Sequence, residues 1–290
     1  MLYQIFFVLL HSHSIGDNMD LQAYFEPVSK EKIGYSSYEN TLCLGSMIDT
    51  YWQEGAFPEL KNVRLAIVGV CEGRRSVNNR GCELAPDTIR QKLYPLAPPV
   101  QERGMVDLGN IAAGTTPEDT YYALTEVLYK LMDSNITVII LGGGHDLAWA
   151  QYKAYEVLGR VINIASIDSR FDIEDAIDSH DSRSYLNRIV MEKPNYLFNF
   201  MALGYQTYFC GKDRVQLMDD LQFDAIRLGE LQQQMAKAEP LLRASDMVTV
   251  DVGAIRQSDA PGQGDPSPHG FYGEEICQMA RFAGMSDKLS

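Results

Sequence analysis

The chain has 290 residues, 46% of them hydrophobic, and a formal net charge of -14 at pH 7. That length and apolar content predict a soluble protein with a large core. The acidic balance argues against nucleic acid or an anionic membrane as a partner, since both need clustered Lys and Arg. The five cysteines are scattered without a CxxC spacing. They predict a reducing, cytoplasmic location and neither a disulfide framework nor a structural zinc site.

The N-terminus carries an apolar run, residues 2–10, that is too short to span a bilayer. No Lys or Arg precedes the run and no small-residue cleavage site follows it, so it does not match a signal peptide. Met19 offers a second start. We expect residues 1–18 to be an extension without structural consequence, and residues 19–290 to form a single domain.

From residue 64 onward, apolar strands alternate with helices. Residues 20–60 mix aromatic and charged side chains and are expected to form helices on an outer face. Strands are expected at residues 64–70, 106–110, 138–141, 161–168, 205–209, 225–228 and 247–252. Helices are expected at residues 85–90, 117–134, 149–158, 214–221 and 230–242, with a loop and a helix within 176–200. The alternation predicts βαβ units, a parallel sheet and right-handed crossovers.

The strand at residues 138–141 ends in three glycines, followed by His145 and Asp146. Its apolar, mostly β-branched residues indicate burial on both faces. Glycines let the backbone turn sharply, and ligands of open α/β sheets bind beyond the carboxyl ends of strands. A plain strand, turn and helix capped by Asp146 explains the stretch equally well. No lysine follows the glycines, which disfavours a phosphate-binding P-loop.

Two further predicted strands end in carboxylates. Asp168, Arg170 and Asp172 are spaced two residues apart, so in extended backbone they point to one side. Asp251 follows the last predicted strand and has the same spacing to Gly253. Carboxylates therefore lie at the ends of two predicted strands, and His145 lies at the end of a third.

If these strand ends meet, His145, Asp168, Asp172 and Asp251 converge on one pocket. Carboxylates so close together would have to protonate unless a cation lies among them. Oxygen ligands with one histidine suit Mn²⁺, and less specifically Mg²⁺ or Fe²⁺. The alternative is that Arg170 neutralises the aspartates and no metal binds.

Three motifs resemble the metal-binding motifs of the ureohydrolase family. They are Gly143-Gly144-His145, Asp168-Ser169-Arg170-Phe171-Asp172, and Asp251-Val252-Gly253 with Ala260-Pro261-Gly262. The members arginase, agmatinase and formimidoylglutamase hydrolyse C–N bonds of guanidines or amidines on a binuclear manganese cluster. The resemblance runs from about residue 65 to the end. It implies an arginase-like α/β fold in three layers, α/β/α, with a mainly parallel sheet.

Two metal-ligand positions of the family are changed in this chain. Arg170 stands where the second motif has histidine, and Gly253 where the third has its second aspartate. In the family, the four retained residue types are the ligands of one manganese, and the two lost ones belong to the other ion alone. A second Mn²⁺ would meet the guanidinium of Arg170 with a repulsion of about 8 kcal/mol, at ~4 Å and an effective dielectric of ~20. The resemblance thus implies at most one Mn²⁺, with Arg170 in place of the second ion.

The resemblance also implies candidate substrate contacts. Glu275 aligns with the family's glutamate that binds the cationic nitrogen of the substrate, and a solvated residue at a helix start is the alternative. His180 falls in the loop where family members contact substrate, with an exposed loop histidine as the alternative, and Arg183 and Asn187 are candidates to hold a substrate carboxylate. With a single metal, Asp172 or a nearby group would have to act as general base. Asp172 and Glu275 are therefore the candidate catalytic residues.

Family members continue beyond the position of Ser290 into one more strand, which lies inside the sheet, and a helix. We therefore expect a C-terminally incomplete domain whose sheet lacks its last strand, with unpaired edges and weak stability. The predicted function is that of a formimidoylglutamase- or arginase-like hydrolase, which uses one Mn²⁺ to cleave a C–N bond in a small linear amidine or guanidine. The alternative is a catalytically inactive member of the fold that acts as a binding or assembly module. A homo-oligomer is compatible with either.

Overall fold

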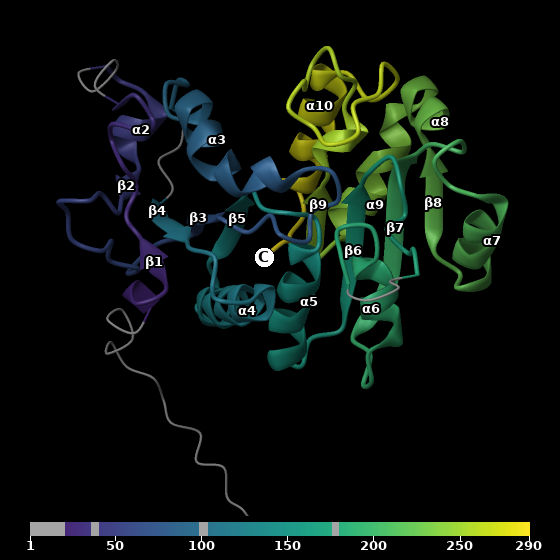
Figure 1. Cartoon of the computed structure of the whole chain (residues 1–290), viewed down its shortest axis with the longest axis horizontal. Coiled ribbons are helices and arrows are strands. Elements are labelled where there is room, and N and C mark those ends of the chain that lie inside the picture. The colour runs from purple at the N-terminus through teal and green to yellow at the C-terminus, as the bar shows by residue number, and fades with distance from the viewer. Residues whose placement is uncertain (1–20, 36–40, 99–103, 176–179) are drawn as a thin grey trace, which may run out of the picture.

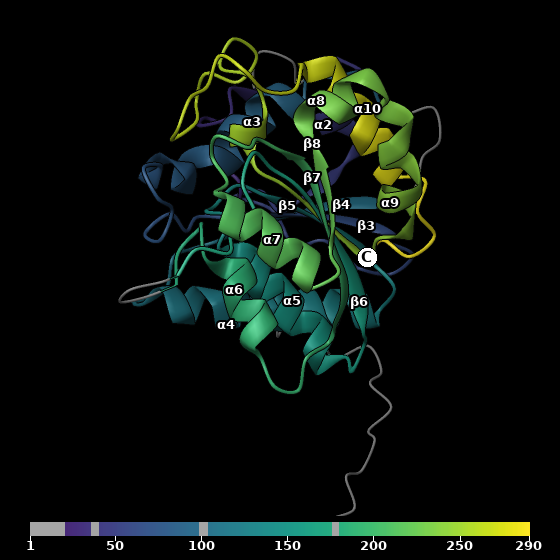
Figure 2. The same cartoon turned by 90° about the vertical axis from the view of Figure 1, so that its right-hand side faces the viewer.

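The computed structural model describes residues 21–35, 41–98, 104–175 and 180–290. The predicted N-terminal extension, residues 1–18, lies outside the described residues. Figure 1 shows two sheets beside each other with helices above and below them, and Figure 2 shows the same layers from the side. The predicted α/β/α architecture with mainly parallel strands is confirmed.

The first sheet has the order β1-β4-β3-β5, with β2 also paired to β4. Its strands are β1 (Phe25–Glu26), β2 (Asp49–Thr50), β3 (Leu65–Val70), β4 (Met105–Ile111) and β5 (Thr137–Leu141). β1 is antiparallel to β4, and all other pairs are parallel. β5 is therefore an edge strand, paired along one side to β3.

The second sheet is entirely parallel, in the order β8-β7-β6-β9. Its strands are β6 (Ile162–Ile167), β7 (Leu197–Tyr205), β8 (Asp224–Arg227) and β9 (Met247–Val250). Within the described chain no strand joins β5 to β9, and Figure 1 places these two on the facing sides of the sheets. The strands of the described residues thus form two sheets with an opening between them.

Helices cover both faces of the sheets. One face carries α4 (Pro117–Asp133), α5 (Leu147–Val157), α6 (Tyr185–Met191) and α7 (Lys212–Asp220). The other carries α2 (Leu44–Met47), α3 (Ala85–Leu93), α8 (Leu228–Gln233), α9 (Ala238–Ala244) and α10 (Gly273–Ala283). Short 3-10 turns lie at Arg80–Leu84, Met235–Lys237 and Val252–Ala254. No helix in the described ranges has both the length and the apolar character that crossing a membrane requires.

Helix α4 shows how the sequence starts and buries these helices. Thr116 accepts a hydrogen bond from the N–H of Asp119, whose carboxylate accepts one from the N–H of Thr116. This reciprocal capping box satisfies two N–H groups at the helix start. Pro117 follows at the first helical position, where a missing N–H breaks no bond. The buried stripe of the helix consists of Tyr121, Leu124, Leu128 and Leu131.

The apolar core is continuous on the face of α4, α5, α6 and α7 and divided on the other face. On the first face, one cluster joins residues of both sheets with these helices. On the opposite face, α8, α9 and α10 pack with β6 and β7 in one cluster. Helix α2 and the end of α3 pack with β3 and β5 in another. The division follows the opening between β5 and β9.

A buried ion pair fixes α3 to the first sheet. The guanidinium of Arg90 donates to the two carboxylate oxygens of Asp107 in β4 at 2.8 and 2.7 Å, and to Asn110 Oδ1 at 2.5 Å. Tyr94 donates a further hydrogen bond to Asp107 at 2.9 Å. Arg90 and Asp107 are both fully buried. If one of them were removed, water could not solvate the charge of the other.

Three predicted elements were wrong. The described part of residues 20–60 holds mainly the short strands β1 and β2 and the helix α2, because pairing with β4 decides its backbone. The strand predicted at 205–209 runs earlier, as β7, and residues 206–210 form a turn. The helix predicted at 230–242 is broken into α8 and α9. Pro240 explains the break, since proline is tolerated in the first turn of a helix but not in its interior.

Strand β5 is more exposed than its sequence predicts. The apolar run 138–141 indicates burial on both faces, yet Ile139 is 42% exposed and Ile140 is only partly buried. That prediction was wrong because β5 borders the opening, where no strand of the described chain covers its outer side.

Candidate metal centre

The turn after β5 carries His145 to the carboxyl end of the first sheet. Gly142 and Gly143 have φ angles of 74° and 78°, a left-handed conformation that favours glycine. A Cβ on Gly143 would lie 2.1 Å from Leu147 Cδ1. Conformation and packing both require glycine here, as the sequence indicated.

The polar groups of this turn are bonded within the protein. The N–H of Gly144 donates to Glu72 O at 2.9 Å, so it is not free to hold a phosphate. The carboxylate of Asp146 makes no capping hydrogen bond to α5 and instead accepts one from the Tyr121 hydroxyl at 2.5 Å. The interpretation of Asp146 as a helix cap was wrong.

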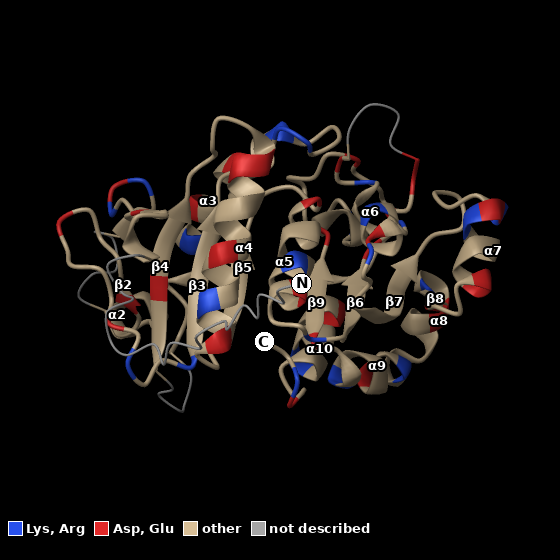
Figure 3. Ribbon diagram, turned by 90° about the horizontal axis from the view of Figure 1, so that it is seen from below, with Lys and Arg blue, Asp and Glu red and all other residues tan. Residues whose placement is uncertain are grey.

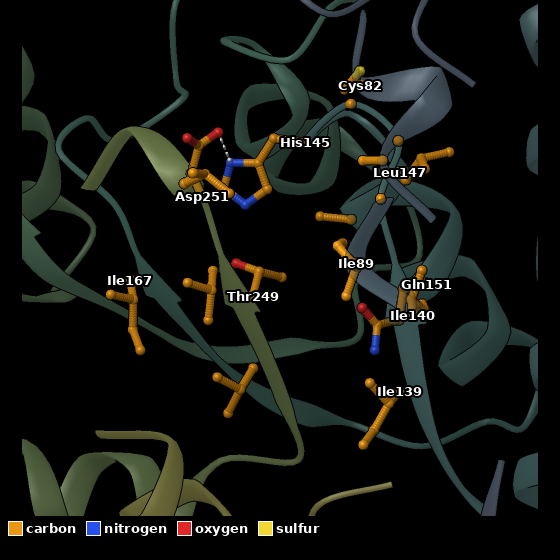
Figure 4. Close-up of a pocket in the computed structure, with 18 of the residues that line it drawn as sticks. Cys82, Ile89, Ile139, Ile140, His145, Leu147, Gln151, Ile167, Thr249 and Asp251 are labelled. Carbon is orange, nitrogen blue, oxygen red and sulfur yellow. Dashed lines mark ion pairs between the residues drawn. The ribbon is translucent and has the colours of Figure 1, made fainter. Parts of the chain in front are cut away.

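Four side chains meet at the carboxyl ends of β5, β6 and β9. The Nδ1 atom of His145 lies 3.1 Å from Asp168 Oδ2, 2.8 Å from Asp172 Oδ2 and 3.6 Å from Asp251 Oδ2. Ligand atoms of His145, Asp168 and Asp172 all lie within 4.8 Å of one another. Asp251 adjoins them through His145, and Figure 4 shows this contact. The structure thus brings together the four residues predicted to converge.

The backbone fixes the direction of each carboxylate. Asp168 follows β6 and accepts the N–H of Arg170 at 2.9 Å. Asp172 has a φ of 50°, a left-handed conformation that aspartate adopts more often than most residues. Asp251 follows β9 and accepts the N–H of Gly253 at 2.5 Å. Strain and backbone contacts of this kind are typical of functional sites.

Burial leaves this cluster electrostatically unbalanced. Burial and the charge of Asp168 raise the pKa of Asp172 well above its usual range and also raise the pKa of Asp251. Burial alone would lower the pKa of His145, but Tyr185 and the close contacts with Asp168 and Asp172 raise it well above 6.5. Three carboxylates around one imidazole leave excess negative charge, which a divalent cation would balance.

Unpartnered polar atoms test whether a cation fits. Both ring nitrogens of His145 and the Oδ2 atom of Asp172 are buried without a hydrogen bond of normal geometry. Buried polar atoms seldom stay in that state unless they bind an ion or water. An imidazole nitrogen among carboxylate oxygens is a donor set that suits Mn²⁺. These residues fit a single divalent cation.

Arg170 is paired outside the carboxylate cluster. Its guanidinium lies 4.4 Å from the centre of the Phe209 ring and makes ion pairs with Glu174 at 3.9 Å and Asp265 at 4.0 Å. Among the residues that the structure describes, no ion pair joins it to the three aspartates. The extended backbone on which their shared direction depended ends at Ile167. That Arg170 takes the place of a second ion stays a prediction.

Gly253 supplies a backbone contact rather than a ligand. Its N–H is bonded to Asp251, and a Cβ built on Gly253 would lie 2.8 Å from Asp251 Oδ1. An aspartate at this position therefore requires the carboxylate of Asp251 to move.

Asp265 is a charged residue of this site that sequence reasoning missed. It forms ion pairs with Arg183 and Arg170 and accepts a hydrogen bond from Asn78 at 3.0 Å. Partial burial acts to raise the pKa of Asp265, but Asn78 and Arg183 hold it below the usual range. Asp265 lies in an irregular loop rich in glycine and proline, and its partners are distant in sequence. No spacing could have identified it.

The predicted substrate contacts do not all lie together. Arg183 lines the cavity beside the metal centre, whereas His180 and Asn187 line a separate pocket of about 290 Å³. Glu275 is not among the residues that line the cavity, and its carboxylate accepts the N–H of Tyr272 at 2.8 Å at the start of α10. Substrate contacts by His180, Asn187 and Glu275 stay predictions, and for Glu275 such a contact would remove a helix cap.

The metal centre opens into one large cavity of about 1920 Å³. Its polar end is lined by the aspartate and histidine cluster, Arg170, Arg183 and Asp265. From there it continues between β5 and β9, where the walls are mainly apolar (Figure 4).

Known proteins resemble this chain in sequence. The family model described as "Arginase family" matches residues 63–289. A formimidoylglutamase of Staphylococcus haemolyticus is 25% identical over 266 residues, covering 83% of this chain and 83% of that protein. A formimidoylglutamase of Lysinibacillus sphaericus is 26% identical over 222 residues, covering 71% of this chain and 68% of that protein.

Solved structures resemble it in fold. The formimidoylglutamase of Bacillus subtilis superposes with a TM-score of 0.73 at 18% identity, covering 85% of this chain and 81% of that one. The Trypanosoma cruzi formiminoglutamase with Mn²⁺ gives a TM-score of 0.71 at 18% identity, covering 80% of this chain and 84% of that one. At these identities the likeness establishes the fold.

Proposed function

The chain belongs to the arginase family, and from that premise we propose that it hydrolyses a C–N bond of a linear amidine or guanidine with one Mn²⁺. The cation would be held by His145, Asp168, Asp172 and Asp251. The observation that carries the proposal is the buried cluster of His145, Asp168 and Asp172, in which donor atoms of His145 and Asp172 lie close together without a hydrogen bond of normal geometry and carry excess negative charge.

The residues of the chain divide the work between them. A bound Mn²⁺ would supply Lewis acidity, which makes water a nucleophile near neutral pH. Asp172 or a nearby group would accept the proton that the water loses. Asp168, held by the N–H of Arg170, keeps its carboxylate fixed beside His145.

Two arginines at the polar end of the cavity suit a substrate that carries carboxylates. Relatives of this chain are formimidoylglutamases, and their name implies an amidine joined to a dicarboxylic amino acid. Arg170 and Arg183 present two guanidinium groups around Asp265. A guanidinium binds carboxylates in a planar, bidentate manner. We assign formimidoylglutamate-like amidines as the substrate class on this basis.

A catalytically inactive binding protein is the second candidate. Arg170 and Gly253 occupy two ligand positions of the family, and the carboxylate of Glu275 is used to cap α10. The two replacements remove metal ligands of the family, and the helix cap occupies the carboxylate that the family uses to bind substrate.

Metal content and turnover together test the proposal. After incubation with Mn²⁺ and removal of free ions, the parent chain should hold about one manganese, and Asp168→Ala should hold none. The control Asp213→Ala removes an exposed carboxylate of α7 and should behave as the parent. The parent, but not Asp168→Ala, should release glutamate from formimidoylglutamate. One ion without turnover of any amidine or guanidine supports the inactive protein, and no bound ion contradicts the proposed centre.

A further inference from the structure

Arg170 lies beside the metal centre and carries a charge of the sign that would neutralise it. The N–H of Arg170 donates to Asp168 Oδ1 at 2.9 Å, so its backbone adjoins the cluster. Its side chain lines the same cavity as Asp168, Asp172 and Asp251. An arginine side chain is long and flexible, and its guanidinium binds carboxylates strongly. A guanidinium turned toward these aspartates would occupy the place of the proposed cation.

The guanidinium of Arg170 instead lies against three groups outside the cluster. Its carbon is 4.4 Å from the centre of the Phe209 ring, and its Nη1 donates to Phe209 O at 3.5 Å. It also forms ion pairs with Glu174 at 3.9 Å and with Asp265 at 4.0 Å. Stacking on an aromatic ring and pairing with carboxylates both favour this outward position.

Asp265 is a partner whose own position does not depend on Arg170. Its Oδ1 accepts a hydrogen bond from Asn78 at 3.0 Å, and its Oδ2 forms an ion pair with Arg183. Asn78 lies between β3 and α3, and Arg183 lies just before α6. Figure 3, with basic residues in blue and acidic ones in red, shows charges of both signs close to α6. Asp265 is thus fixed from two other parts of the chain, and Arg170 is the group that is able to turn.

Phe209 is fixed as well. Its N–H donates to Gln206 O at 2.9 Å in the turn after β7, and its ring contacts the ring of Tyr208 edge to face at 4.7 Å. Glu174 is the weakest of the three outward partners, because its side chain is 48% exposed and an ion pair in water contributes little.

We propose, on the basis of the metal centre proposed above, that Asp265 and Phe209 hold the guanidinium of Arg170 outside the aspartate cluster and so keep the metal site open to a divalent cation. An inward guanidinium and a bound cation exclude each other. The apparent Kd for the cation therefore equals its intrinsic Kd divided by the fraction of molecules with the guanidinium outside. Asp265 and Phe209 are then positioning residues, which act on the metal through Arg170.

The affinity of the full chain for Mn²⁺, measured by competition with a fluorescent chelator, tests the proposal. Asp265→Asn with Phe209→Leu should raise the Kd for Mn²⁺ by about tenfold or more, as expected if the guanidinium stays outside in about a tenth of the molecules. In an Arg170→Gln background the same two substitutions should raise the Kd by less than about threefold, because no guanidinium is left to turn inward.

The Arg170→Gln background is needed because Asp265 also acts on the cluster directly. Burial and the charge of Asp168 raise the pKa of Asp251 most, and the charge of Asp265 adds to them. Removal of Asp265 therefore weakens cation binding to a small extent even without Arg170. The difference between the two backgrounds isolates the part that passes through Arg170.

Arg183 provides the matched control, because it is the other guanidinium on Asp265. In an Arg183→Gln background the two substitutions should still raise the Kd about tenfold. Asp265→Asn alone preserves the shape of the side chain and should raise the Kd about threefold, an effect that Arg170→Gln abolishes, so it serves if the double variant does not fold. Crystals of Asp265→Asn with Phe209→Leu grown without Mn²⁺ should show the guanidinium of Arg170 paired with Asp168 or Asp251.

Equal losses of affinity with and without Arg170 would show that Asp265 acts by its charge alone. Loss of the effect in the Arg183→Gln background would assign it to the other guanidinium. Binding that is about tenfold tighter in Arg170→Gln than in the parent would show that the guanidinium already competes with the cation. Each of these results overturns the proposal and leaves the metal centre in place. If neither the parent nor Arg170→Gln binds Mn²⁺, the proposed centre itself is refuted, and this role of Asp265 with it.

Discussion

The Nδ1 atom of His145 lies 3.6 Å from Asp251 Oδ2, and this contact joins the ends of β5 and β9, which belong to different sheets. His145 follows the first sheet, whereas the three aspartates follow strands of the second. A cation bound by these residues would therefore hold the two sheets together.

Manganese should stabilise the fold as well as support hydrolysis. A ligand present at a hundred times its Kd stabilises a protein by about 2.7 kcal/mol, which corresponds to a rise in Tm of about 4–5 °C for a chain of this length, at an unfolding entropy of about 2.1 cal/mol/K per residue. Scanning calorimetry with and without Mn²⁺ measures the rise. Asp251→Ala should lose most of it and Asp213→Ala none. A full rise in Asp251→Ala would show that Asp251 is not a ligand.

Restoring both changed ligand positions should create a second metal site. The double variant Arg170→His with Gly253→Asp should raise manganese content from about one to about two ions per chain. Each single variant should stay near one, because it restores only one ligand, and the new aspartate must displace Asp251 Oδ1. Arg183→His with Gly253→Asp is the matched control. If the double variant binds no more than the parent, these positions are not the ligand positions of the family.

Glu72 should make stability depend on pH in the acid range. Burial acts to raise the pKa of Glu72, but hydrogen bonds from Arg74 and Thr120 lower it below 4.5. Its contribution is therefore complete above pH 4.5 and is lost as the pH falls through the lowered pKa. Glu72→Gln should reduce the free energy of unfolding at pH 7 by about 1–3 kcal/mol. In urea titrations this difference should shrink below pH 4.5, and a constant difference would contradict the argument.

The buried pair of Arg90 and Asp107 should be costly to break. Arg90→Leu leaves the Asp107 carboxylate buried without its cation, which should lower the free energy of unfolding by about 3–5 kcal/mol. Lys237→Ala removes an exposed ion pair with Glu230 and should change it by less than about 1 kcal/mol. Urea unfolding at pH 7 compares the two. Similar losses in both variants would show that burial of the first pair has no energetic weight.

Local signals in the sequence predicted the parts of the site that lie on regular structure. Gly142 and Gly143 have the left-handed conformation that the turn after β5 requires, and Asp168 and Asp251 follow apolar strands directly. Parallel strands end at one edge, so these residues could be brought together from the sequence alone.

The remaining features depend on irregular backbone or on distant contacts. Arg170 does not share a direction with Asp168, because β6 ends at Ile167 and Asp172 adopts a left-handed φ of 50°. Asp265 is recognisable only through Arg183 and Arg170, which lie far away in the chain. The short strands β1 and β2 form because they pair with β4. The strand propensity of their own residues does not predict that pairing.

The core of this molecule is unbroken beneath the two sheets and divided above them. The two sheets can therefore move apart most easily by hinging about the side where the core is continuous. The separation of the two halves is then the softest coordinate of the fold, and both the metal centre and the opening between β5 and β9 span it. A cation bound by His145 and the three aspartates would fix that separation at one value, and any ligand that favours the same value would raise the cation's affinity by the factor by which the cation raises the ligand's.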